Sequence, residues 1–100
     1  MQINSNTQGN ETVATLIGRL DTLAAQEATA QFEALKEKTD GTVVLDCSQL
    51  EYISSSGLRL FLTLRKAAAA NGGEVIIRNI NPDVRSVFMI TGFLNLFEIQ

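Results

Sequence analysis

Three adjacent serines, Ser54-Ser55-Ser56, stand directly before Gly57 and form the segment of this chain best suited to chemistry. Serine hydroxyls can cap a helix, act as nucleophiles or accept a phosphoryl group. A nucleophilic serine needs an adjacent base at neutral pH, and the sequence contains no histidine. The Gly-x-Ser-x-Gly pattern of hydrolases and the Gly-x4-Gly-Lys-Ser/Thr phosphate-binding loop are also missing. We therefore expect no catalytic residue, no enzyme activity and no cofactor.

Phosphoryl acceptance demands the least of the chain itself, because a kinase supplies the base, the metal and the nucleotide. A helix N-terminus tolerates the added anion, since its free N–H groups and dipole favour negative charge. One serine of the triplet is expected to be the helix N-cap, and capping needs only one. Gly57 lacks a side chain beside Ser56, which would let another protein approach the hydroxyl. The triplet thus favours an accessible, phosphorylatable serine at a helix start.

Composition excludes several other classes of function. The chain contains eight Lys and Arg residues and eleven Asp and Glu residues, which gives a net charge of −3, and the basic residues form no cluster. Nucleic-acid binding and direct binding to anionic membranes both draw on such clusters, so neither is expected. Cys47 is the only cysteine, which rules out an internal disulfide, and without histidine no metal site is expected. The first residues do not resemble a signal peptide and no apolar run is long enough to cross a bilayer, so we expect a cytoplasmic protein.

Strand and helix patterns alternate along the chain and predict a single α/β domain over residues 1–100. Strands are expected over residues 12–20, 43–46 and 74–80, with short additional strands near Ile3 and at 97–99. The 12–20 strand is apolar on both faces, so we expect it to be covered on both sides. Cys47 to Ser56 is expected to be a loop at the carboxyl end of a central strand, where sites of parallel α/β sheets usually form.

Three helices are expected between these strands. The first follows a cap at Asp21 and Thr22 and runs to about Lys38, and its buried stripe is expected to contain Ala24, Ala28, Phe32 and Leu35. The second runs over residues 57–70, and the third begins at Asn81-Pro82 and ends at Gly92. Because strands separated by helices need crossover connections, the neighbouring strands are expected to be largely parallel.

Three motifs in this order resemble the STAS domain of bacterial anti-sigma factor antagonists. Gly18-Arg19-Leu20-Asp21 resembles the family's Gly-x-Leu-Asp at the end of its second strand. Val43-Val44-Leu45-Asp46, a loop and then Ser55-Ser56-Gly57-Leu58 resemble its strand and Ser-Ser-Gly-Leu phosphorylation motif. Asn81 to Gly92, followed by Phe93-Leu94, resembles its third helix and exit. The resemblance implies a STAS-like single layer of four to five mostly parallel strands, with three main helices packed mainly on one face.

The resemblance also implies the function and its partners. The serine directly before the glycine, Ser56, would be the phosphate acceptor, with Ser55 as a secondary site. Ser54 stands where the family commonly has an acidic residue and is a further candidate acceptor. The unphosphorylated protein would sequester an anti-sigma factor that is also a serine kinase with a histidine-kinase-type ATPase fold. A serine phosphatase would reverse the modification.

The expected partner-binding surface combines the end of the second strand with the start of the second helix. The second helix is apolar around most of its circumference, which suggests a contact beyond the sheet, although cover by another helix of the same domain is the favoured explanation. Asp21 is at least as well explained as a helix cap. The candidate binding residues are Asp21, Ser54, Ser55, Gly57, Leu58, Arg59, Phe61 and Leu62.

Two other functions stay open. A constitutive STAS structural subunit of a membrane-transport complex or signalling scaffold would use the serines only as a cap and the second helix as a permanent interface. A small-ligand site at the carboxyl end of the sheet is suggested by fold analogy alone.

Overall fold

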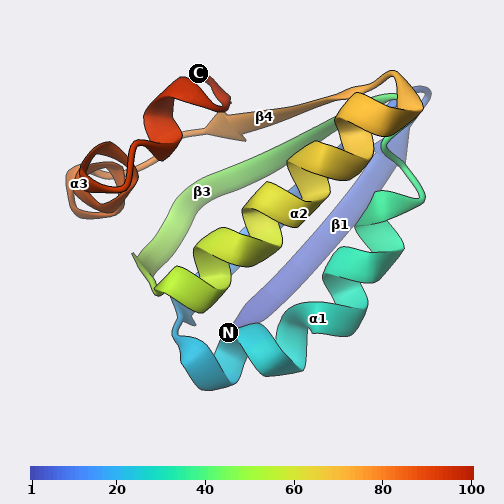
Figure 1. The fold of residues 1–100 in the computed structure, drawn as a ribbon. Helices are drawn as coiled ribbons and strands as arrows, with labels where there is room; N and C mark the ends of the chain where they lie inside the picture. The colour runs from blue at the N-terminus through green and yellow to red at the C-terminus, as the bar shows by residue number, and fades with distance from the viewer.

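The computed structural model of the chain describes residues 1–100, which form one five-stranded sheet with three α-helices (Figure 1). The strands lie in the order β1-β2-β3-β4-β5; β1 is antiparallel to β2 and all other neighbours are parallel. This confirms the expected α/β class with mostly parallel strands. In chain order the elements are β1 (Gln2–Gln8), β2 (Glu11–Leu20), α1 (Thr22–Lys36), β3 (Thr42–Ile53), α2 (Ser55–Asn71), β4 (Glu74–Arg78), α3 (Pro82–Ile90), the 3-10 helix η1 (Phe93–Asn95) and β5 (Glu98–Ile99).

The helices cover one face of the sheet. Each crossover from β2 to β5 moves to the next strand in the same direction, and right-handed crossovers of that kind place every helix on the same side. α1 and α2 lie side by side across the sheet, and α3 lies at the far end beyond β3 (Figure 1). On β2, Leu16 is fully buried under the helices, whereas Val13 and Ile17 on the opposite face are only half-buried. The expectation that this strand is covered on both sides is therefore wrong.

All five phenylalanines meet in the core beneath the helices. Phe61 of α2 is the centre of this cluster, with its ring centroid 5.8 Å from that of Phe32 on α1 and 5.9 Å from that of Phe88 on α3. Phe97 lies 6.5 Å from Phe61 on the third side, and Phe93 packs against Phe88 at 6.4 Å. Full burial of one such ring stabilises the fold by about 1.5–3 kcal/mol. Because Phe61 of α2 contacts rings on α1 and α3, it joins the three α-helices in one cluster.

β3 is longer than expected, because it continues through residues 47–53 where a loop was predicted. Its first half pairs with both β2 and β4, but its second half pairs only with the end of β2, from Ile17↔Gln49 to Leu20↔Ile53. Two register shifts in the β2–β3 ladder absorb the irregular spacing. On the side that β4 does not reach, the Leu50 carbonyl accepts a 2.7 Å hydrogen bond from the Asn81 side chain. Backbone pairing to β2 thus outweighs the polar composition of this segment.

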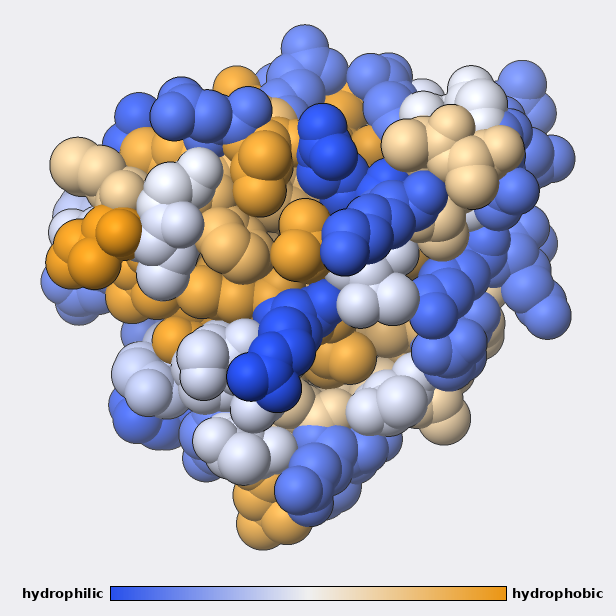
Figure 2. All heavy atoms as spheres, viewed as in Figure 1, coloured by the Kyte–Doolittle hydropathy of each residue, from blue (hydrophilic) through white to orange (hydrophobic).

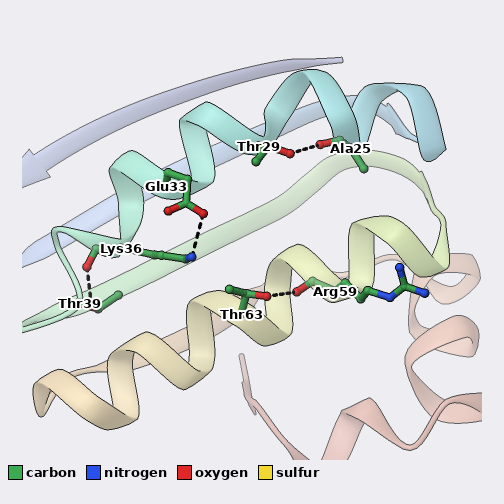
Figure 3. A network of polar contacts seen from close by, with 7 residues as sticks. All are labelled: Ala25, Thr29, Glu33, Lys36, Thr39, Arg59 and Thr63. Carbon is green, nitrogen blue, oxygen red and sulfur yellow. Dashed lines mark hydrogen bonds and ion pairs between the residues drawn. The ribbon is translucent and has the colours of Figure 1, made fainter.

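The first helix differs slightly from the expectation. It ends at Lys36 rather than Lys38, and its buried stripe contains Ala25 in place of Ala24, which is half-buried. Thr39 is fully buried just beyond the helix end, where its hydroxyl donates to the Lys36 carbonyl at 2.6 Å (Figure 3). The same hydroxyl accepts a 2.8 Å hydrogen bond from the Asn71 side chain at the end of α2. These hydrogen bonds cap the end of α1, so the helix ends at Lys36, before the end that the sequence pattern predicts.

Candidate phosphorylation and docking site

The serine triplet begins α2, and Ser54 is its N-cap. The Ser54 hydroxyl accepts the backbone N–H of Gly57 at 3.1 Å, and the Ser54 carbonyl accepts the N–H of Leu58 at 2.9 Å. The Ser54 N–H in turn donates to the carbonyl of Leu20 at 2.9 Å, which ties the helix start to the end of β2. With 9% of its surface exposed and its hydroxyl engaged, Ser54 is the capping serine of the triplet. This placement weakens Ser54 as a rival acceptor.

Ser55 and Ser56 occupy the first turn of α2 without a capping task. Ser55 is exposed, Ser56 is half-buried, and neither side chain takes part in the hydrogen bond that caps the helix. Ser56 lines a shallow groove of about 210 Å³ between α1 and α2. The other residues of this groove, called the α1–α2 groove below, are Ala25, Gln26, Thr29, Arg59 and Leu60. The Ser56 hydroxyl is therefore reachable from solvent at the open end of a helix.

The absence of a side chain at Gly57 has a packing reason that the sequence analysis did not identify. A Cβ at this position would lie 2.8 Å from Cγ of Leu20 and 2.9 Å from Cγ1 of Ile53. Both neighbours are fully buried at the ends of β2 and β3, so neither has space to withdraw. Gly57 is itself buried and faces the interior of the domain. The expectation that Gly57 opens a path for a partner is thus replaced by close packing of α2 onto the sheet.

Asp21 begins α1 as its N-cap, accepting the N–H of Ala24 at 2.9 Å, in agreement with the capping interpretation. It is exposed and directly follows Leu20, while Ser56 directly precedes Gly57, and Leu20 and Gly57 are in contact. The starts of α1 and α2 therefore lie at the same edge of the sheet, where the Ser54 N–H donates to the Leu20 carbonyl.

The remaining candidate binding residues on α2 divide by burial. Leu58 and Phe61 are buried in the core, where Phe61 is the centre of the aromatic cluster, so they are not available to a partner. Leu62 is half-buried and Arg59 is exposed. The apolar character of α2 is thus mostly explained by its cover within the domain, because α1 lies along one side of it and the sheet beneath it (Figure 1).

Two large apolar side chains of α3 are exposed to solvent. Met89 and Ile90 are 60% and 85% exposed. Val84 and Phe88 form the buried face of α3, so the residues after Phe88 necessarily point outward. Neither residue is among the binding residues expected from the sequence. Figure 2 shows apolar side chains gathered over the part of the surface formed by α2 and α3, while hydrophilic side chains dominate the side of α1.

Two titratable groups on β3 have altered proton affinities. Burial, and next the charge of Asp46, raises the pKa of the Cys47 thiol to about 12, so the thiol is protonated and unreactive. Partial burial alone would raise the pKa of Asp46. Hydrogen bonds from Ser48 and Asn79, together with the charge of Arg78, outweigh burial and hold the pKa of Asp46 below its usual range. Neither group borders the α1–α2 groove.

No three acidic, Cys or His side chains are arranged to hold a metal ion. None of the helices combines the length and apolarity that a membrane crossing requires.

Comparison with known proteins gives a consistent result. The STAS domain profile matches residues 2–100. BtrV of Bordetella bronchiseptica, provisionally named an anti-sigma factor antagonist, is 38% identical over 87% of this chain and 75% of its own length. A STAS-domain containing protein of Pseudomonas aeruginosa is 30% identical over 92% of this chain and 90% of its own length. The phosphorylated form of SpoIIAA, a cell fate determinant of Bacillus, superimposes with a TM-score of 0.73 at 23% identity, over 99% of this chain and 91% of that one. At this identity the structural likeness demonstrates a shared fold.

Proposed function

This chain belongs to the STAS-domain family, and from that premise we propose that it is an anti-sigma factor antagonist controlled by phosphorylation of Ser56. Unphosphorylated, it binds and sequesters an anti-sigma factor in the cytoplasm. It acts by binding and not by catalysis. The observation that supports the proposal is that the serines of the triplet have different surroundings. Ser54 caps α2, which leaves the Ser56 hydroxyl free in an accessible groove.

The chemistry is done by the partner. We infer that the anti-sigma factor is itself a serine kinase with a histidine-kinase-type ATPase fold. The Ser56 oxygen attacks the γ-phosphorus of ATP, the hydroxyl proton passes to the kinase's base, and ADP leaves. The geometry of the first turn supports this step, because the hydroxyl of Ser56 does not have to be withdrawn from a cap before it can react. A serine phosphatase restores the hydroxyl.

Phosphorylation then switches binding through charge. It adds about −1.5 to −2 at the first turn of α2, where the dipole and free N–H groups tolerate an anion, so the domain stays folded. In a docked complex the same dianion would be desolvated without a partner of its own. Moving binding from nearly complete to nearly absent takes about 5.5 kcal/mol, which such a charge can supply. The docking surface would include the exposed residues around Ser56, namely Asp21, Ser55 and Arg59.

The first experiment locates the acceptor. The domain is incubated with ATP and a serine-kinase anti-sigma factor, and intact mass and peptide mass spectrometry follow. Wild type and Ser55→Ala should gain one phosphate on the 54–56 peptide, whereas Ser56→Ala should gain little or none, any remainder being on the secondary site Ser55. Phosphorylation of Ser56→Ala to the same extent as wild type would reject Ser56 as the main acceptor.

The second experiment tests the switch by isothermal titration calorimetry with the same anti-sigma factor. Ser56→Ala should bind as wild type does, and Ser56→Asp should bind roughly 100-fold more weakly, since it carries only part of the phosphate charge. Thr63→Asp is the matched control, because it places the same charge on an exposed side chain of α2 outside the proposed docking surface, and it should bind as wild type does. Equal affinities for Ser56→Asp and Ser56→Ala would instead favour a constitutive binding subunit.

A further inference from the structure

We propose that Arg59 is the intramolecular partner of a phosphate on Ser56, and that the α1–α2 groove is the seat of that phosphate. The proposal rests on the proposed function, because it concerns the modified state of the same serine. It assigns to Arg59 a role as a phosphate-positioning residue in the phosphorylated state, in addition to the partner contact expected from the sequence.

The first argument is the position of Arg59 relative to Ser56 on α2. Ser56 and Arg59 are three residues apart on α2, a spacing that brings two side chains together on one face of a helix. Both line the α1–α2 groove, whose volume of about 210 Å³ exceeds that of several water molecules, each of which takes about 30 Å³ in the liquid. A phosphoryl group of four heavy atoms therefore fits between the two helices without displacing the core.

The second argument is that the Arg59 guanidinium has no ion-pair partner within the domain. The ion pair formed within the domain joins Lys36 to Glu33 at 2.8 Å on α1, so the Arg59 guanidinium holds no carboxylate (Figure 3). Figure 3 shows the Arg59 side chain extended along α2 toward its N-terminal end, while its backbone carbonyl accepts the Thr63 hydroxyl at 2.8 Å. The guanidinium is therefore available to a new anion, and its planar fork matches phosphate oxygens.

The other groups around the groove leave Arg59 as the dominant charge. The Thr29 hydroxyl is already used, because it donates to the Ala25 carbonyl at 3.0 Å. Gln26 is the remaining neutral side chain with donors, and Arg59 is the one charged side chain that lines the groove. The first turn of α2 contains no acidic residue, and Asp21, the N-cap of α1, does not line the groove. The positive end of the α2 dipole adds to the attraction of Arg59 for the dianion.

Pairing of this kind has a consequence for the switch. In the unmodified domain the exposed Arg59 is free to meet an acidic group of the anti-sigma factor. Once Ser56 carries a phosphate, Arg59 turns to it and is withdrawn from the docking surface. Phosphorylation thus removes one attractive contact in addition to placing a negative charge in the interface.

The test uses the full chain with phosphoserine inserted at position 56 during translation, so that no kinase is needed. The phosphorus resonance is titrated with pH by nuclear magnetic resonance at low salt. A neighbouring guanidinium favours the dianion, so Arg59→Gln should raise the midpoint of the titration by roughly half a pH unit. Arg59→Lys should raise it by less, because an ammonium keeps the charge and loses the bidentate geometry.

Lys66→Gln is the matched control, since it removes one exposed positive charge from the same helix ten residues from Ser56. Its titration midpoint should equal that of the wild-type chain. If Arg59→Gln and Lys66→Gln give the same midpoint, the pairing is rejected. A failure of any kinase to modify Ser56 would reject the proposed function and leave this result unaffected, so the two ideas fail separately.

Discussion

Replacing Gly57 by alanine tests the packing of the helix start on the sheet. The added Cβ would lie 2.8 Å from Cγ of Leu20 and 2.9 Å from both Cδ2 of Leu20 and Cγ1 of Ile53. These are contacts that real methyl groups do not make, and both neighbours are fully buried. α2 therefore has to move away from the ends of β2 and β3, or the two side chains have to leave their preferred rotamers.

The size of the effect follows from two opposing terms. Overpacking in a well-packed interior costs about 1–3 kcal/mol. Removal of a helical glycine returns up to about 1 kcal/mol, and less in a first turn than in a helix interior. The net loss in the free energy of unfolding should be about 1 kcal/mol, which lowers the Tm of a domain of this size by roughly 4–8 °C.

Thermal unfolding followed by circular dichroism measures this loss. Thr63→Ala, on the exposed face of α2, is the control for helix propensity and should leave the free energy of unfolding within about 0.5 kcal/mol of wild type. Amide chemical shifts in Gly57→Ala should change at Leu20, Ile53 and the first turn of α2. A Tm for Gly57→Ala equal to or above that of wild type would mean that the helix start has room to adjust, and the packing explanation of Gly57 would be wrong.

Two further predictions concern the cap and the titration of β3. Ser54→Ala leaves the N–H of Gly57 without an acceptor and should destabilise the domain by about 1–2 kcal/mol in chemical denaturation, whereas Ser55→Ala should cost under about 0.5 kcal/mol. The pKa of Asp46 is lowered in the folded state from its ordinary 3.8, so the stability it contributes is present above that value and is lost as pH falls through the folded pKa. Asp46→Asn should therefore flatten the decline of unfolding free energy between about pH 4 and 2, and an unchanged slope would count against these hydrogen bonds.

The sequence by itself determined the order of the elements and the identity of the family. Residues that act on their own backbone were predicted well: Asp21 and Asn81 cap α1 and α3, and one serine of the triplet caps α2. Apolar periodicity likewise placed Ala28, Phe32 and Leu35 in the core. These features depend on local geometry and on side-chain spacing, both of which are written in the chain.

Only the tertiary structure decided which face of each element is covered and which serine is free. The extension of β3 to Ile53, the burial of Gly57, Leu58 and Phe61 and the outward position of Ile90 depend on partners distant in sequence. The assignment of Ser54 to the cap and Ser56 to the groove follows from how the end of β2 holds the start of α2. Adjacent serines are chemically alike, so their different roles arise from their surroundings, and those surroundings exist only once the sheet and helices have packed together.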